Sequence, residues 1–142
     1  MKQSILIIQD SKALRYLIAT TLSEKYLIKS VQTSNQAMQL FISNEEIDLV
    51  ILDIASGSSE SFELFEHISS SSILKDIPVV VLSGNNDEEL RKNVLEMGAS
   101  AFIAKPFDPV VLKAEIDRIL LVDVAEVIHK KKRVFNLNIN LF

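Results

Sequence analysis

Short aliphatic runs alternate along this chain with longer stretches in which apolar residues recur at helical spacing. The runs are four to seven residues long, which is typical of strands, whereas the stretches between them have the period of amphipathic helices. Runs without polar residues, such as "ILII" and "VVVL", indicate strands that are covered on both faces. The pattern predicts strands at 5–8, 27–31, 48–53, 77–83 and 101–104, and helices at 11–22, 34–43, 60–69, 87–97 and 108–121.

This alternation predicts the fold class. Five strands that alternate with five helices are typical of an α/β protein with a mostly parallel sheet. Right-handed crossovers then place helices on both faces of this sheet. We therefore expect a flavodoxin-like three-layer sandwich. Ser11 and Asp108 are predicted N-caps, and Gly98 is the predicted stop of the helix at 87–97. The segment 27–31 alternates polar and apolar residues, which indicates an edge strand.

Composition narrows the class of protein. A chain of 142 residues with 48% hydrophobic residues fits one domain, and it has neither an apolar run long enough to span a membrane nor a pattern typical of a secretory signal. The absence of cysteine fits the reducing cytoplasm, where we expect the protein to lie. The net charge of -4 argues against direct nucleic acid binding, although 129–133 ("HKKKR") is locally basic.

Polar side chains follow four of the predicted strands, at the point where each strand ends. They are Gln9 and Asp10 after the first strand, Asp53 at the end of the third, Ser83 at the end of the fourth and Lys105 after the fifth. Because sites in open parallel sheets lie beyond the carboxyl ends of the strands, we expect these side chains to meet there. Two carboxylates suit a hard divalent cation, and an ammonium suits an anion, so the set indicates phosphoryl transfer.

Four motifs make the chain resemble a known family. "ILIIQDS", "DLVILDI", "IPVVVLSG" and "GASAFIAKPF" occur in the order found in receiver domains of bacterial two-component response regulators, a family that includes the chemotaxis response regulator. The resemblance covers residues 3–121, and "AKPF" followed by a helix that opens at "DP" is its most specific part. It implies a signalling domain that assists only its own phosphorylation and dephosphorylation.

The resemblance implies a role for each matching residue. Asp53 would accept phosphate from a sensor histidine kinase or a phosphotransfer protein. Asp10, Asp53 and the backbone carbonyl of Ala55 would bind Mg²⁺. Ser83 would hydrogen-bond the phosphoryl group, and Lys105 would pair with one of its oxygens.

Two further positions follow from the same resemblance. Phe102 stands where the family has a switch aromatic, whose ring turns inward when Ser83 moves toward the phosphate. The bond between Lys105 and Pro106 is expected to be cis. The switched surface would then bind a downstream partner protein that the sequence does not identify.

Some positions depart from the family pattern. Gln9 replaces an acidic residue that usually holds the metal through water, and an amide can accept from such a water but brings no charge. The loop "IASGSSES" also differs, with Gly57 where proline is common, and Ala55 and Asn85 stand where the family tunes hydrolysis of the phosphoryl group. A degenerate receiver that binds partners without phosphorylation therefore remains an alternative.

Two other classes share parts of the pattern. A flavodoxin would need a hydroxyl-rich phosphate loop after the first strand, where this chain has "QDSK". A haloacid-dehalogenase-type phosphatase would need a second aspartate two residues after Asp53, where this chain has Ala55.

The predicted receiver domain spans 1–121, and 122–142 is predicted to be a helical extension or tail. Within it, "FNLNINL" alternates apolar residues with asparagine, and an isolated strand of this kind seeks a sheet edge or a partner chain. We therefore expect the tail to promote a homodimer. A linker to a further segment is the alternative.

Overall fold

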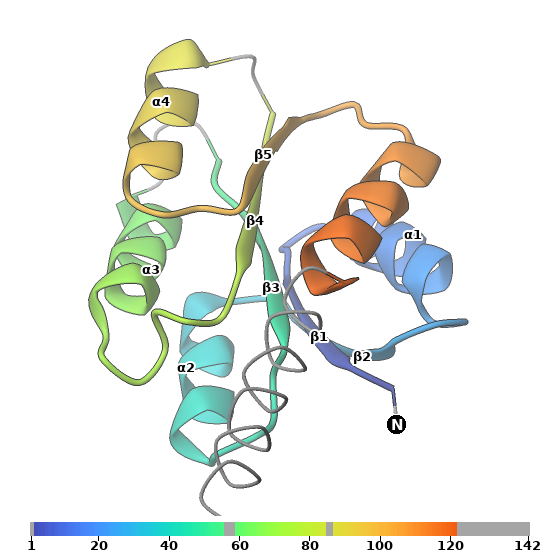
Figure 1. Cartoon of the computed structure of the whole chain (residues 1–142), viewed down its shortest axis with the longest axis horizontal. Helices are drawn as coiled ribbons and strands as arrows, with labels where there is room; N and C mark the ends of the chain where they lie inside the picture. Colours follow the sequence, from blue (N-terminus) through green and yellow to red (C-terminus); the bar gives the residue numbers. More distant parts are fainter. Residues whose placement is uncertain (1, 56–58, 85–86, 122–142) are drawn as a thin grey trace, which may run out of the picture.

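The computed structural model describes residues 2–55, 59–84 and 87–121, and its centre is a single parallel sheet of five strands. The strands lie in the order β2-β1-β3-β4-β5 (Figure 1). Their bounds are β1 Ser4–Ile8, β2 Leu27–Val31, β3 Leu49–Asp53, β4 Val79–Ser83 and β5 Ala101–Ala104. The helices are α1 Lys12–Leu22, α2 Ser34–Ile42, α3 Ser59–Ser70, α4 Glu88–Glu96 and a last helix over 109–121.

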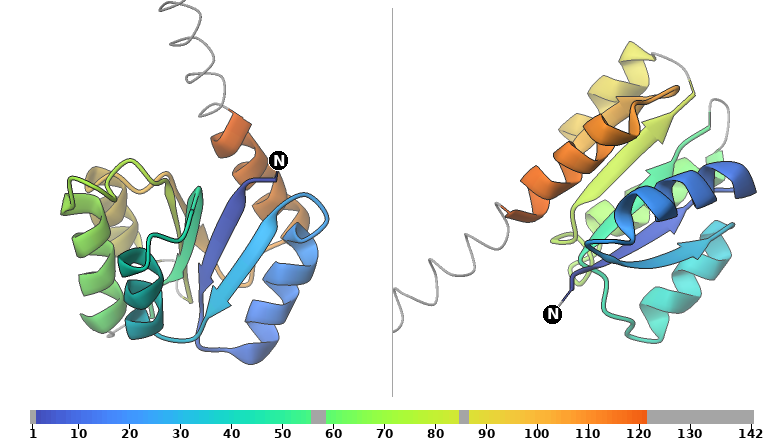
Figure 2. Two further views of the ribbon diagram at one scale, coloured as in Figure 1. Left: turned by 90° about the horizontal axis from the view of Figure 1, so that it is seen from below. Right: turned by 90° about the vertical axis from the view of Figure 1, so that its right-hand side faces the viewer.

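The helices cover both faces of the sheet. In Figures 1 and 2, α1 and the last helix lie on one face, and α2, α3 and α4 lie on the other. This arrangement confirms the predicted three-layer α/β sandwich with five strands and five helices. It follows from the right-handed connection of parallel strands, which carries each helix across a face of the sheet.

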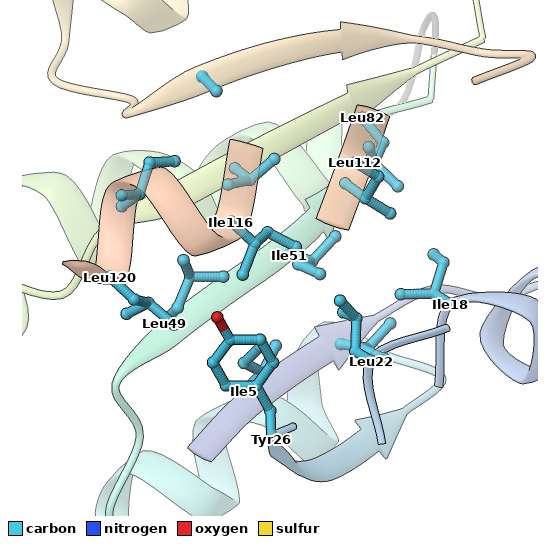
Figure 3. Close-up of a cluster of buried hydrophobic side chains, with 14 residues drawn as sticks. Ile5, Ile18, Leu22, Tyr26, Leu49, Ile51, Leu82, Leu112, Ile116 and Leu120 are labelled. Carbon is cyan, nitrogen blue, oxygen red and sulfur yellow. The ribbon is translucent and has the colours of Figure 1, made fainter. Parts of the chain in front are cut away.

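Each face of the sheet has its own hydrophobic core, because successive strand residues point to opposite sides. In β1, Ile5 and Ile7 face α1 and the last helix, while Leu6 and Ile8 face α2 and α3. Figure 3 shows the first of these cores. All five residues of β1 and of β4 are buried, as the unbroken aliphatic runs predict, whereas β2 is an edge strand with Leu27 52% exposed.

Local hydrogen bonds fix where the helices begin and end. The Ser11 hydroxyl caps α1 as predicted, and Thr33 with Gln36 forms a capping box at α2. Asp87 caps α4, and Gly98 follows that helix with φ 107°, a left-handed conformation that favours glycine. Within the described residues, no helix is both long and apolar enough to span a membrane.

Candidate functional site

The ends of the central strands bring the predicted polar residues to one edge of the sheet. Asp53 and Ser83 are the last residues of β3 and β4, and they stand opposite Leu82 and Ala104 in the ladders. Gln9 and Lys105 directly follow β1 and β5. Parallel register therefore places all four residues at the carboxyl edge, where ligands bind in sheets of this kind.

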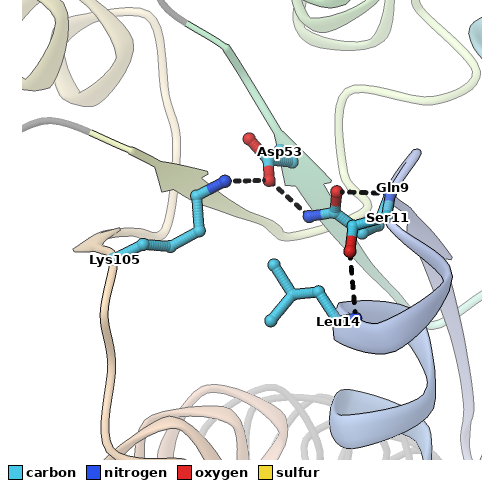
Figure 4. Close-up of polar contacts among 5 residues, drawn as sticks. All are labelled: Gln9, Ser11, Leu14, Asp53 and Lys105. Carbon is cyan, nitrogen blue, oxygen red and sulfur yellow. Dashed lines mark hydrogen bonds and ion pairs between the residues drawn. The ribbon is translucent and has the colours of Figure 1, made fainter.

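Asp53 is the centre of the polar contacts. Its side chain is only 8% exposed, and its Oδ2 accepts hydrogen bonds from Lys105 Nζ at 2.5 Å and from the side-chain amide of Gln9 (Figure 4). Its other oxygen, Oδ1, is buried and has no hydrogen-bond partner among the described residues. The carboxylate is thus held through one oxygen, while the second oxygen keeps its lone pairs free.

Gln9 is buried and is fixed at both ends of its amide. Nε2 donates to Asp53, and Oε1 accepts the backbone N–H of Ser11 at 3.0 Å. The Arg15 guanidinium then ties down the loop, because it donates to the carbonyls of Gln9 at 2.7 Å and Asp10 at 3.1 Å. The nitrogen of Gln9 therefore faces Asp53, whereas its oxygen was predicted to accept a hydrogen bond from a metal-bound water.

Ser83 presents a second buried oxygen without a partner. The residue is fully buried at the end of β4, and its Oγ has no hydrogen-bond partner within the described ranges. Leaving a buried polar group unpaired costs roughly 1–3 kcal/mol, so such groups are rare in native proteins. Ser83 Oγ and Asp53 Oδ1 lie at the ends of neighbouring strands, which marks a place where a polar ligand would find partners.

A cavity opens beside Asp53. It has a volume of about 210 Å³, enough for several water molecules, and lies between the ends of β1, β2 and β3. Besides Gln9, Asp10, Asp53 and Ala55, it is lined by Ile8, Gln32, Thr33, Ser34, Glu60 and Ser61.

The residues around this cavity suit a hard divalent cation such as Mg²⁺. Asp53 Oδ1 is an oxygen donor without a partner in the described structure, Asp10 is exposed beside it, and Ala55 lines the same cavity. Two carboxylates and a carbonyl are enough for a cation that keeps several waters. However, the described residues contain no group of three acidic, cysteine or histidine side chains that could hold a metal.

The structure thus brings together most of the predicted site. Gln9, Asp10, Asp53 and Ala55 line one cavity, Lys105 pairs with Asp53, and the bond between Lys105 and Pro106 is cis as expected. Phe102 is half-buried on β5 and packs against the core beneath α2, α3 and α4. Gly57 and Asn85 lie outside the described residues.

Sequence reasoning missed the residues that position Gln9. Ser11 was predicted only as a helix cap, and Arg15 was given no role. Arg15 stands four residues after Ser11, so one helical turn returns its side chain to the end of β1. This spacing was the signal that could have identified it.

Comparison with known proteins points to one family. The model of the response regulator receiver domain matches residues 5–117. The regulatory protein VirG of Agrobacterium tumefaciens is 35% identical over 105 residues, which are 72% of this chain and 38% of VirG. The transcriptional regulatory protein GltR of Pseudomonas aeruginosa is 34% identical over 119 residues, which are 83% of this chain and 49% of GltR.

A solved structure agrees with these relatives. The signal receiver domain of a signal transduction histidine kinase from Syntrophus aciditrophicus is 30% identical, with a TM-score of 0.72 over 83% of this chain and 89% of that one. VirG and GltR are much longer than the chain, which spans less than half of either. The similarity therefore concerns one domain of those regulators.

Proposed function

Because this chain belongs to the response regulator receiver domains, a family of signalling domains rather than classical enzymes, we propose that Asp53 is its phosphoacceptor in a two-component phosphorelay. One observation carries the proposal. Asp53 is held by Lys105 and Gln9 through Oδ2, while Oδ1 is buried without a partner among the described residues, beside a cavity. A carboxylate so arranged has one oxygen oriented for attack and one anchored by donors.

The proposed step is a transfer of the phosphoryl group to Oδ1. The oxygen attacks phosphorus, the bond from phosphorus to the donor atom breaks, and the donor atom keeps the electron pair. That atom is the imidazole nitrogen of a histidine kinase or phosphotransfer protein, or the acyl oxygen of a small donor such as acetyl phosphate. The ammonium of Lys105, already beside Asp53, pairs with the phosphoryl oxygens as their charge develops.

Receiver domains typically use Mg²⁺, and in this chain we assign it to Asp10, Asp53 and the carbonyl of Ala55. When bound, the cation neutralises charge on the phosphoryl group. The chain's own contribution is to hold Asp53 in place, to leave its Oδ1 without a partner among the described residues, and to supply one fixed positive charge through Lys105.

We assign the output of the switch to Ser83 and Phe102. The unpaired Ser83 hydroxyl would gain a partner by donating to a phosphoryl oxygen, which gives the phosphorylated state a contact that the free state lacks. Phe102 lies on β5, the strand beside Ser83, so a shift of β4 reaches its ring. A downstream protein would bind the surface that results, and the same site would assist loss of the phosphoryl group to water.

The domain assignment is also a proposal. We assign the receiver to 1–121, and the extension at 122–142 lies outside the described residues. The longer regulators among the relatives suggest that the domain works together with a further effector, either in its own chain or in a separate protein.

One feature favours the alternative of a degenerate receiver. Gln9 already donates to Oδ2 of Asp53 without a metal, and it takes the place of one carboxylate of the family pattern. A domain of this kind would bind its partner in one state only, without phosphorylation.

Intact mass spectrometry separates the two functions. We expect the protein incubated with acetyl phosphate and Mg²⁺ to gain the mass of one phosphoryl group, and Asp53→Asn to gain none. An unchanged mass of the wild-type protein, across donors and Mg²⁺ concentrations, would support the degenerate receiver instead.

A further inference from the structure

The contact between Gln9 and Asp53 gives Gln9 a role of its own. We infer that Gln9 is a positioning residue, which holds the Asp53 carboxylate ready for phosphoryl transfer when no metal is bound. The inference rests on the proposed function and deepens it. The hydrogen bond from Gln9 to Asp53 would make phosphorylation of this protein less dependent on divalent cations than phosphorylation of a variant with a carboxylate at position 9.

The orientation of the Gln9 amide follows from its two partners. Ser11 N is a donor and the Asp53 carboxylate is an acceptor, so the amide oxygen must face the first and the amide nitrogen the second. The reverse orientation would set donor against donor and acceptor against acceptor. The direction of the contact with Asp53 is therefore chemically fixed.

The charges around Asp53 explain why the hydrogen bond from Gln9 stabilises the metal-free site. A carboxylate at position 9 would face Asp53 with a like charge, and a bound cation would relieve this repulsion. The amide of Gln9 instead donates to Asp53, and Lys105 balances the negative charge on the same oxygen. Asp53 is thus compensated by residues of the chain itself, and Oδ1 stays free.

The amide can also reach beyond Asp53. A primary amide carries two N–H groups, and Asp53 accepts one of them. The other has no hydrogen-bond partner among the described residues, and Gln9 lines the cavity where a phosphoryl group would enter. This second N–H is therefore placed to donate to an entering phosphoryl oxygen. It would partly replace the cation, which neutralises charge on the phosphoryl group.

The first test measures the contact in metal-free protein, independently of phosphorylation. In chelator, the side-chain amide signals of Gln9 in an NMR spectrum should be shifted from those of exposed glutamines, such as Gln39, and slow to exchange with water. In Asp53→Ala they should return toward the Gln39 values. Gln9 signals at free-amide positions in the wild-type protein would overturn the inference, whatever phosphorylation does.

The second test compares initial phosphorylation rates by acetyl phosphate, in saturating Mg²⁺ and in chelator. Gln9→Met, which keeps the size of the side chain but not the donor, should lower the rate in chelator about tenfold and the rate in Mg²⁺ much less. Gln9→Asp should raise the ratio of the two rates by at least about tenfold, and the control Gln39→Met should leave it unchanged.

The outcomes separate this inference from the proposed function. Phosphorylation of every Gln9 variant with the wild-type ratio of rates would overturn the inference and leave the proposed function standing. A bound amide in the NMR spectrum, together with no phosphorylation of wild-type protein in Mg²⁺, would overturn the proposed function. That result would also reject the role of Gln9 in transfer and leave Gln9 as a structural contact alone.

Discussion

Single residues at the ends of four strands determine what this receiver domain can do. Asp53 carries the free oxygen, Lys105 the positive charge and Gln9 the neutral donor. With one carboxylate fewer than the family pattern, the site is expected to attract a dication less strongly and to have less repulsion between its carboxylates in the metal-free state. These opposite effects can be measured separately.

Replacing Gln9 with aspartate should restore the missing charge. We expect Gln9→Asp to bind Mg²⁺ about fivefold to tenfold more tightly, because one added charge beside a dication in a wet site contributes about 1 kcal/mol after screening. Without metal, the same variant should melt at a lower temperature, since it loses the hydrogen bond to Asp53 and adds a like charge.

The control is Gln32→Asp, which adds the same charge at the rim of the cavity without contacting Asp53. A Mg²⁺ titration and a melt in chelator are needed for both variants. Equal Mg²⁺ affinities of wild type and Gln9→Asp would mean that position 9 does not face the cation.

Two serines near the site should respond to alanine in opposite ways. Ser83→Ala removes a buried hydroxyl that has no hydrogen-bond partner among the described residues, so stability without phosphate should change by less than about 1 kcal/mol or increase. Ser11→Ala removes the cap of α1 and should cost about 1 kcal/mol, although Ser11 is exposed. Urea unfolding measures the free energy of unfolding of each variant. A large loss of stability in Ser83→Ala would show that the Ser83 hydroxyl is hydrogen-bonded.

The sequence predicted which residues meet at the carboxyl edge, because strand ends in a parallel sheet converge whatever the details of the loops. It did not give the orientation of Gln9. That depends on the Ser11 N–H, a backbone group whose direction is set only once α1 is capped and packed. Side-chain pairing of this kind is a property of the folded loop and leaves no periodic signal.

At the scale of elements, one carboxylate makes the polar contacts that join the last helix to the segment before β2. Asp117 accepts from the Tyr26 hydroxyl and from Lys113 at 3.0 Å, and it forms an ion pair with Lys25 at 3.3 Å. Tyr26 and Lys25 belong to the segment between α1 and β2, so the contacts join two neighbouring elements. Burial, together with the hydrogen bond to Asp117, raises the pKa of Tyr26 above its ordinary value of 10.0.

This network predicts a pH dependence of stability. Burial alone would raise the pKa of Asp117, but hydrogen bonds from Tyr26, Lys113 and Lys25 lower it overall. A carboxyl with a lowered folded-state pKa stabilises the fold above its unfolded-state pKa, and this contribution is lost as pH falls through the folded-state value. Asp117→Asn should therefore cost about 1 kcal/mol near neutral pH and progressively less in acid.

Glu115→Gln is the matched control on the same helix. The pKa of Glu115 is also lowered, chiefly by the hydrogen bond from Arg118, but this partner lies within the same helix and the pair is largely exposed. Its loss should cost only a few tenths of a kcal/mol. Denaturant unfolding from about pH 3 to pH 7 gives the free energy of unfolding of each variant as a function of pH. Equal effects of the two variants would contradict the claim that Asp117 stabilises the contact between two elements.

Most helices and strands could be predicted from local signals, and their observed bounds differ from the predicted ones by only one or two residues. The strand predicted at 77–83 begins at Val79, because Ile77 still donates its backbone N–H to Leu74 in the preceding turn. The apolar run alone could not show this, since a buried turn and a buried strand have the same composition.

At the scale of the whole molecule, the alternation of strands and helices predicted the class of architecture. Topology rules leave few ways to arrange such a chain, and a family resemblance selected among them. The tail is different, because 122–142 lies outside the described residues and its predicted association stays a prediction.

Sedimentation tests whether the tail promotes self-association. The full chain is expected to sediment as a dimer at high concentration, and a version that ends at Leu121 as a monomer, because the alternating "FNLNINL" segment can pair with another strand. Equal monomeric masses of the two proteins would reject the prediction.

The most direct test of the central claim is to locate the phosphoryl group. After reaction with acetyl phosphate and Mg²⁺, borohydride reduces an aspartyl phosphate to homoserine, and peptide mass spectrometry then identifies the altered residue. We predict homoserine at position 53 and unchanged aspartate at position 10. Modification of Asp10, or of neither residue in protein that has gained phosphoryl mass, would contradict Asp53 as the phosphoacceptor.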